Sequence, residues 1–190
     1  MSVRLDSGWQ KVSINIFTFI GIICSGVGQL LICYNNWTAG VIFILTGLII
    51  DLFDGVIARR YNLTTKVGAY LDTVNDILIY LTFPFLAIDF WLSDSLWVYG
   101  YGFLVICGLY RLFRHSSSGF AKAGYYKGLP VYYNFLLIVV AKYTANSSLI
   151  IILSVLIGIL GISKISVKKF SWQQSLYLVT LISLITLWPK

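Results

Sequence analysis

Four of the seven acidic residues of this 190-residue chain fall within one short stretch, and all seven are Asp. Asp51 and Asp54 are three residues apart, and Asp72 and Asp76 are four apart, so on helices each pair shares one face. The link between the pairs is short, which predicts two antiparallel helices that bring four carboxylates to one depth. Such a cluster cannot stay fully ionised without cations between its members.

An acidic cluster that offers only oxygen ligands, without His or Cys, suits Mg²⁺ or Mn²⁺ rather than Zn²⁺. Two such ions bridged by carboxylates form the usual clamp for phosphoryl chemistry. Ion pairing with the neighbouring Arg and Lys residues is the alternative, but pairing alone would not need Gly55, Ala58 and Gly68 nearby. Small residues let a ligand or a second backbone approach closely. We therefore expect a functional metal site.

The composition indicates what kind of protein surrounds these acids. Hydrophobic residues make up 58% of the chain, the mean hydropathy is +0.85, and only 11% of residues are charged, against about a quarter in soluble domains. This excludes a soluble enzyme, a disordered chain and a disulfide-stapled secreted domain. The net charge of +7 comes from Lys and Arg placed singly or in small groups between apolar runs. Membrane topology explains this charge better than a nucleic-acid partner, which needs a basic face on a soluble fold.

Seven apolar runs approach the length of about 20 residues that a helix needs to cross a bilayer. They are 12–33, 37–57, 68–92, 96–113, 129–145, 147–165 and 172–188. We expect an all-α, polytopic integral membrane helical bundle with about six to seven transmembrane helices. Residues 1–190 are predicted to form a single domain, and residues 1–11 could lie on the membrane surface.

The connections between these runs alternate between basic and non-basic. The N-terminus, the link after the second run, the link after the fourth and the link after the sixth carry Lys or Arg, whereas the links between them carry none. The positive-inside rule therefore predicts that the N-terminus and the acid cluster face the cytoplasm. Lys142, near the outer end of the fifth run, and the terminal Lys190 are exceptions.

The acids belong to a longer pattern. The eight fixed positions are Asp51-x2-Asp54-Gly55-x2-Ala58-Arg59-x8-Gly68-x3-Asp72-x3-Asp76. This pattern resembles the full signature of the CDP-alcohol phosphotransferase family, and Asn15 and Thr18 resemble the Asn-x-x-Thr that members carry in their first span. The resemblance implies a helical membrane enzyme, usually a homodimer, that displaces CMP from a CDP-linked lipid or alcohol with an incoming hydroxyl.

The resemblance also implies roles for individual residues. Asp51, Asp54, Asp72 and Asp76 would hold two divalent cations, Mg²⁺ or Mn²⁺, and Asp76 would also be the catalytic base for the acceptor hydroxyl. The residues implied to line the CDP site are Gly55, Ala58, Arg59, Gly68, Asn15 and Thr18. General chemistry agrees, because a diphosphate needs cations to stabilise CMP as a leaving group and an Arg can add a charge-assisted contact to phosphate.

Residues outside the signature must select the acceptor alcohol. Three segments occur in the order found in the phosphatidylserine synthase branch: Arg111-Leu112-Phe113-Arg114, Gly128-Leu129-Pro130 and Ser163-Lys164-Ile165 with Phe170. Arg111 and Arg114 could receive the serine carboxylate or a lipid phosphate, or could be ordinary positive-inside anchors. We therefore expect phosphatidyl transfer from CDP-diacylglycerol to L-serine.

Two alternatives remain at this point. Residues 77–84 and 128–134 resemble the phosphatidylcholine synthase branch, and Tyr125, Tyr126, Tyr132 and Tyr133 could build an aromatic cage for choline. Choline or another small alcohol, as in phosphatidylcholine or phosphatidylglycerophosphate synthases, is thus the second choice. A membrane transporter is the non-enzyme alternative, although a carrier is expected to place its ionisable residues near the membrane midplane.

Overall fold

Each of the seven apolar runs is helical over most of its length in the computed structural model, which describes residues 7–61, 63, 65–117, 125–168 and 172–187. The elements are α1 (Ser7–Cys33), α2 (Trp37–Arg60), α3 (Lys66–Ile77), the π-helical η1 (Leu78–Thr82), α4 (Phe83–Trp91), α5 (Trp97–Ser117), β1 (Tyr125–Lys127), the 3₁₀-helical η2 (Val131–Asn134), α6 (Phe135–Thr144), α7 (Ser147–Ile162), β2 (Ser166–Lys168) and α8 (Trp172–Leu187). The expected all-α class is confirmed. The small addition is an antiparallel pairing of β1 with β2.

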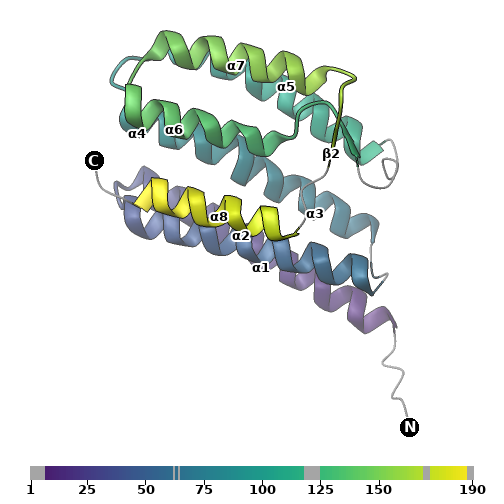
Figure 1. The fold of residues 1–190 in the computed structure, drawn as a ribbon. Coiled ribbons are helices and arrows are strands. Elements are labelled where there is room, and N and C mark those ends of the chain that lie inside the picture. Colours follow the sequence, from purple (N-terminus) through teal and green to yellow (C-terminus); the bar gives the residue numbers. More distant parts are fainter. Residues whose placement is uncertain (1–6, 62, 64, 118–124, 169–171, 188–190) are drawn as a thin grey trace.

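Three helical stretches within the described residues are long and apolar enough to cross a membrane. They are Val12–Cys33, Trp37–Ala58 and the continuous α3–η1–α4 helix, Lys66–Trp91. Val131–Thr144 and Ser147–Ile162 are shorter apolar helices. The helices lie side by side as a bundle, with the beginning of α1 and the end of α8 at opposite ends of it (Figure 1).

The same bundle end collects the connections that carry Lys and Arg. The α2–α3 link, β1 and β2 all lie at the end where α1 begins, whereas the α1–α2, α4–α5 and α6–α7 turns lie at the other end (Figure 1). Lys66, Lys127, Lys164 and Lys168 are exposed at the first end. The basic and non-basic connections that alternate along the sequence thus lie at opposite ends of the bundle.

Glycines let α1 and α2 pack closely along each other. A Cβ added to Gly28 would lie 2.6 Å from the Gly40 carbonyl oxygen, and one added to Gly40 would lie 2.6 Å from the Gly28 oxygen. A Cβ on Gly47 would overlap the Ser25 hydroxyl. Small residues are the usual means of close helix packing in membranes, where lipid tails are as apolar as Leu. α1 also packs against α3, so it holds α2 and α3 in one arrangement.

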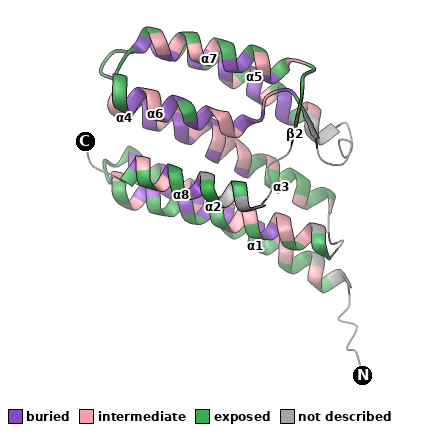
Figure 2. Ribbon diagram, viewed as in Figure 1, coloured by how far each residue is buried: buried purple, intermediate pink, exposed green. Residues whose placement is uncertain are grey.

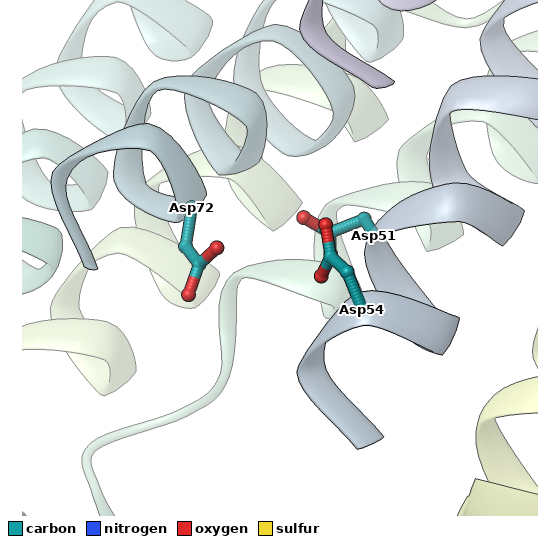
Figure 3. Close-up of side chains that lie close together, drawn as sticks. All are labelled: Asp51, Asp54 and Asp72. Atoms are coloured by element: carbon teal, nitrogen blue, oxygen red, sulfur yellow. The ribbon is translucent and has the colours of Figure 1, made fainter. Parts of the chain in front are cut away.

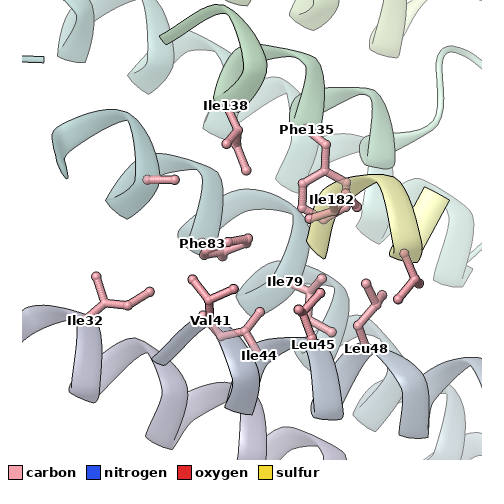
Figure 4. Packing of buried hydrophobic residues seen from close by; sticks show 12 residues of the cluster. Ile32, Val41, Ile44, Leu45, Leu48, Ile79, Phe83, Phe135, Ile138 and Ile182 are labelled. Atoms are coloured by element: carbon pink, nitrogen blue, oxygen red, sulfur yellow. The ribbon is translucent and has the colours of Figure 1, made fainter. Parts of the chain in front are cut away.

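The largest apolar cluster surrounds η1 and α4. Ile79 and Phe83 pack with Val41 and Ile44 of α2 and with Phe135 of α6 (Figure 4). Figure 2 shows the resulting pattern, with buried positions facing the inside of the bundle and many exposed positions facing outward. The exposed positions include many large hydrophobic side chains, as a lipid-facing surface requires.

Side chains from three other helices hold the π-helical segment. Gln29 Nε2 donates to the Leu78 carbonyl at 2.8 Å, Asn134 Nδ2 to the Tyr80 carbonyl at 2.8 Å, and the Tyr101 hydroxyl to the Leu81 carbonyl at 2.7 Å. A π-helical turn contains one more residue per hydrogen-bonded ring than an α-turn and is often found at functional sites. Here it begins two residues after Asp76.

The last helix, α8, is attached at its C-terminal carbonyls. Trp37 Nε1 donates to the Thr186 carbonyl at 3.0 Å, and Lys142 Nζ donates to the Ile185 carbonyl. The Lys142 side chain is 3% exposed, and its ammonium lies 5.4 Å from the Trp91 ring centroid. Lys142 is therefore not part of an exposed connection, to which the positive-inside rule applies. It is buried inside the bundle, where it caps the C-terminal end of α8.

Replacing Lys142 by Met should lower the free energy of unfolding by about 1–3 kcal/mol, because a helix-end carbonyl would lose its donor in apolar surroundings. Thermal unfolding of the detergent-solubilised protein measures this. Lys164→Met removes an exposed Lys and is the matched control. Equal unfolding temperatures for Lys142→Met and the control would contradict the cap.

Candidate metal centre

Three of the four clustered acids meet in the structure. One carboxylate oxygen from each of Asp51, Asp54 and Asp72 lies within 4.8 Å of the other two. Asp51 and Asp54 project from α2 toward Asp72 on α3 (Figure 3). Asp54 is 3% exposed, Asp51 is half-buried and Asp72 is exposed, so the cluster runs from the protein interior to its surface. The predicted convergence of the two helices is confirmed for these three residues.

The donor set fits a hard divalent cation. Three carboxylates this close repel one another, and a cation between them removes that repulsion. Carboxylate oxygen is the ligand type that Mg²⁺ and Mn²⁺ prefer, and neither His nor Cys contributes to this group. The three carboxylates could therefore bind a metal ion.

Asp76 occupies a different position from the other three acids. It lies one turn beyond Asp72 on α3 and is half-buried. In the described residues, the group of mutually close acids does not include it. The charges of Asp51 and Asp72 act on Asp76, and so does the buried Arg111 of α5. This position beside the cluster suits a group that exchanges a proton with a substrate.

The side chains that hold the cluster include two that sequence reasoning missed. Asn75 Nδ2 donates to Asp51 Oδ1 at 2.9 Å, and the Ser25 hydroxyl is 3.0 Å from Asn75 Oδ1. Both Asn75 and Ser25 are 0% exposed. The signal in the sequence was that both are polar residues within predicted membrane spans, where polar side chains mark function or helix pairing.

The first turn of α3 brings together residues that the resemblance assigned to the CDP site. The Thr65 hydroxyl caps α3 by accepting from the Gly68 amide at 2.9 Å, and it donates to Asn15 Oδ1 at 3.0 Å. A Cβ on Gly68 would lie 3.1 Å from both Asn15 Oδ1 and Thr65 Oγ1. Thr18 is buried, and its hydroxyl donates to the Ile14 carbonyl.

The remaining residues of the signature lie on the last turns of α2. Gly55 and Ala58 follow Asp54 there and are half-buried. The side chain of Arg59 lies outside the part of the chain that the structure describes. The structure thus places the backbone of these three positions beside the acids.

Gly68→Val should reduce CMP release by about a hundredfold, because the added methyl groups would displace Asn15 and the cap of α3 from the site. Gly68→Ala should have a smaller effect, since its Cβ requires shifts of only a few tenths of an ångström. A CMP-release assay with a thermal unfolding measurement tests both. Gly102→Val is the matched control, because a Cβ at this α5 glycine meets nothing within 4 Å. Unchanged CMP release in Gly68→Val would show that the close approach is dispensable.

The structure separates the two arginines predicted to bind acceptor or phosphate. Arg111 is buried and acts on Asp76. Arg114 donates from Nη1 to the Ile162 carbonyl at 3.0 Å and from Nη2 to the Lys127 carbonyl at 3.1 Å. Arg114 therefore joins α5 to α7 and β1, whereas Arg111 is buried inside the bundle.

Gly128 has a conformational reason to be glycine. Its φ is +83°, and an added Cβ would overlap the Gly161 carbonyl oxygen. Its amide donates to the Ile165 carbonyl at 2.7 Å, which continues the contact between the segments of β1 and β2. The Gly-Leu-Pro segment thus closes this end of the bundle.

The structure describes the side chains of two of the four tyrosines considered for a choline cage, Tyr132 and Tyr133. The Tyr132 and Tyr133 rings stack on each other, with centroids 5.0 Å apart. Both line an apolar groove of about 270 Å³ between α6 and α8. The side chains of Tyr125 and Tyr126 lie outside the described residues.

Comparison with known proteins decides the family. A family model described as CDP-alcohol phosphatidyltransferase matches residues 12–187, from the first helix to the last. The chain belongs to this family. It is therefore an integral membrane protein and a transferase of phospholipid biosynthesis, and the resemblance seen in the eight-residue signature is confirmed.

Several curated proteins are similar in sequence to this chain. The CDP-diacylglycerol--serine O-phosphatidyltransferase of Bacillus subtilis is 27% identical over 165 residues, which cover 83% of this chain and 87% of that protein. A protein of the same name from Methanocaldococcus jannaschii is 29% identical over 158 residues, 83% of this chain and 75% of that protein. A CDP-diacylglycerol--glycerol-3-phosphate 3-phosphatidyltransferase from Wigglesworthia glossinidia brevipalpis is 42% identical over 63 residues, 33% of each chain.

Proposed function

We propose that this enzyme transfers the phosphatidyl group of CDP-diacylglycerol to the hydroxyl of L-serine and releases CMP. The observation that supports the chemistry is the convergence of Asp51, Asp54 and Asp72 from two helices within the family signature. The choice of serine is supported by relatives named as serine O-phosphatidyltransferases that align with most of this chain. The glycerol-3-phosphate relative aligns with only a third of it.

The proposed metal site uses Asp51, Asp54 and Asp72, with Asp76 at its edge, to hold two divalent cations, Mg²⁺ or Mn²⁺. When bound, these cations would offset the negative charge of the diphosphate and stabilise CMP as it leaves. Gly55, Ala58 and Gly68 leave room for the nucleotide, while Asn15, Thr18 and Arg59 offer polar groups to it.

Asp76 is the proposed base. It takes the proton of the serine hydroxyl as the serine oxygen forms a bond to the phosphorus that carries diacylglycerol. The bond between that phosphorus and the oxygen bridging to CMP breaks, and the electron pair leaves with CMP. Arg111 lies where it acts on Asp76 and can also receive the serine carboxylate, because a guanidinium binds a carboxylate in a planar, charge-assisted contact. Arg114 remains a second candidate for a phosphate contact.

The proposed setting is one domain, residues 1–190, with its N-terminus and active site on the cytoplasmic side, working as a homodimer. The exposed Lys residues at the bundle end where α1 begins support this orientation. The partners are CDP-diacylglycerol, L-serine and the lipid bilayer.

Purified enzyme in mixed micelles with CDP-diacylglycerol and Mg²⁺ or Mn²⁺ should release CMP when L-serine is added. Parallel reactions with choline, glycerol 3-phosphate and inositol phosphate identify the acceptor. CMP release with another acceptor and not with serine would overturn the proposed substrate while leaving the chemistry intact. No CMP with any of the four would contradict the proposed transfer.

A further inference from the structure

Asn75 lies between the two acids of α3 in sequence, yet its side chain faces away from solvent. It is 0% exposed, whereas Asp72 is exposed and Asp76 is half-buried. A residue next to Asp76 on an α-helix projects about 100° away from it. Buried amides are costly unless their hydrogen bonds are made. The contacts of Asn75 therefore explain why a polar residue occupies this position.

The orientation of the Asn75 amide follows from its two partners. The Ser25 hydroxyl can donate to Oδ1 at 3.0 Å, and the carboxylate of Asp51 can only accept, so the NH₂ group must face Asp51. Gly47 of α2 leaves no more room at Ser25 than the hydroxyl needs. The single hydrogen of this hydroxyl is shared between two acceptors that are each 3.0 Å away, Asn75 Oδ1 and the Gly21 carbonyl oxygen. Ser25, Asn75 and Asp51 thus link α1, α3 and α2 in one chain of hydrogen bonds.

An amide suits this place electrostatically. Asn75 gives Asp51 a directed hydrogen bond without adding a positive charge, so the cluster keeps the negative charge that attracts a cation. A Lys or Arg at the same point would compete with the cation for the carboxylate. A carboxylate has two oxygens and about four lone-pair directions, so Asp51 can accept from Asn75 and still bind a metal ion.

We propose that Asn75 is a positioning residue that, held by Ser25, fixes the Asp51 carboxylate in the orientation required for metal binding. This role rests on the proposed metal site and assigns to α1 a part in building it. Partners of metal ligands typically contribute 10–100-fold to metal affinity or activity.

The test measures Mn²⁺ binding to the purified full-length protein by electron paramagnetic resonance, without substrate. Asn75→Leu keeps the approximate volume and removes both hydrogen bonds, and should weaken Mn²⁺ affinity by about tenfold or more. Ser25→Ala should weaken it less, because the amide keeps its contact with Asp51. The double variant should bind no more weakly than Asn75→Leu, since Ser25 acts through Asn75.

Two controls separate positioning from general destabilisation. Tyr101→Phe removes a buried hydrogen bond to the same long helix, at Leu81, and should lower the unfolding temperature while leaving Mn²⁺ affinity within about twofold. Ser154→Ala removes another fully buried hydroxyl, on α7, which has no hydrogen-bond partner among the described residues, and should leave Mn²⁺ affinity within about twofold. Unfolding temperatures in EDTA show which variants are folded, and Ser25→Ala provides the decisive comparison if Asn75→Leu does not fold.

The outcomes distinguish this role from the metal site itself. Wild-type protein that binds Mn²⁺, together with a folded Asn75→Leu or Ser25→Ala variant of equal affinity, would overturn the positioning role alone. Wild-type protein that binds no Mn²⁺ would overturn the metal site and this role together. An equal loss of affinity in Tyr101→Phe would show that packing of the helix, not the Asn75 contact, governs binding.

Discussion

Asp76→Asn is expected to lower the rate of CMP release by about a thousandfold, within the 10²–10⁴-fold range that a general base contributes. Asn has nearly the same shape as Asp but cannot take a proton from the acceptor hydroxyl. The fold should survive, because Asp76 is only half-buried and the α3–η1–α4 helix is held by its neighbours on both sides.

The structure also predicts how Asp76→Asn affects metal binding. Asp51, Asp54 and Asp72 remain as a close group without Asp76, so Mn²⁺ affinity should fall far less than the rate. Measuring CMP release and Mn²⁺ binding on the same preparation checks both. Asp89→Asn, which removes an exposed acid of α4, is the matched control. An active Asp76→Asn would remove the assigned base, whereas a parallel loss of rate and affinity would make Asp76 chiefly a metal ligand.

Removal of divalent cations with EDTA should reduce CMP release to background, and Mg²⁺ or Mn²⁺ should restore it. The reason is the mutual repulsion of three carboxylates within 4.8 Å, which would also repel the diphosphate of the substrate. Added cation should raise the unfolding temperature as well, because it binds the folded protein and not the unfolded chain.

Substitution of the most buried acid in the cluster tests this dependence on divalent cations most directly. Asp54→Asn removes one charge from the protected side of the cluster and should raise the Mn²⁺ concentration for half-maximal activity by about tenfold or more. Asp94→Asn, in the turn at the other end of the bundle, is the control. Full activity of wild-type enzyme in excess EDTA would contradict the metal-dependent chemistry.

The sequence was sufficient to predict the helices and the meeting of three of the four acids. Hydropathy marks each helix because a backbone inside a bilayer must make its own hydrogen bonds. The intervals Asp51 to Asp54 and Asp72 to Asp76 determine which helix faces carry the acids, and the short α2–α3 link brings those faces together. These features depend on local spacing, which a sequence displays directly.

Features that depend on contacts between distant segments could not be predicted in this way. Asn75 and Ser25 are 50 residues apart, and their contact exists because α3 and α1 pack against each other. Arg111 and Arg114 look alike in sequence, and only the fold shows that Arg114 donates to backbone carbonyls of α7 and β1. The pairing of β1 with β2 joins segments that are separated by η2, α6 and α7.

The π-helical segment also has a consequence for how the longest helix can vary. Each residue of an α-helix turns the chain by about 100°, and the extra residue in Leu78–Thr82 absorbs such a turn between the acid-bearing half and the half that carries Phe83, Ala87 and Ile88. Each half can thus match its own neighbours, although one continuous α-helix would satisfy only one of them. Deleting one residue of Leu78–Thr82 would rotate one half of the helix by about 100° relative to the other. Either the carboxylates or the buried Phe83 would then face the wrong neighbouring helix.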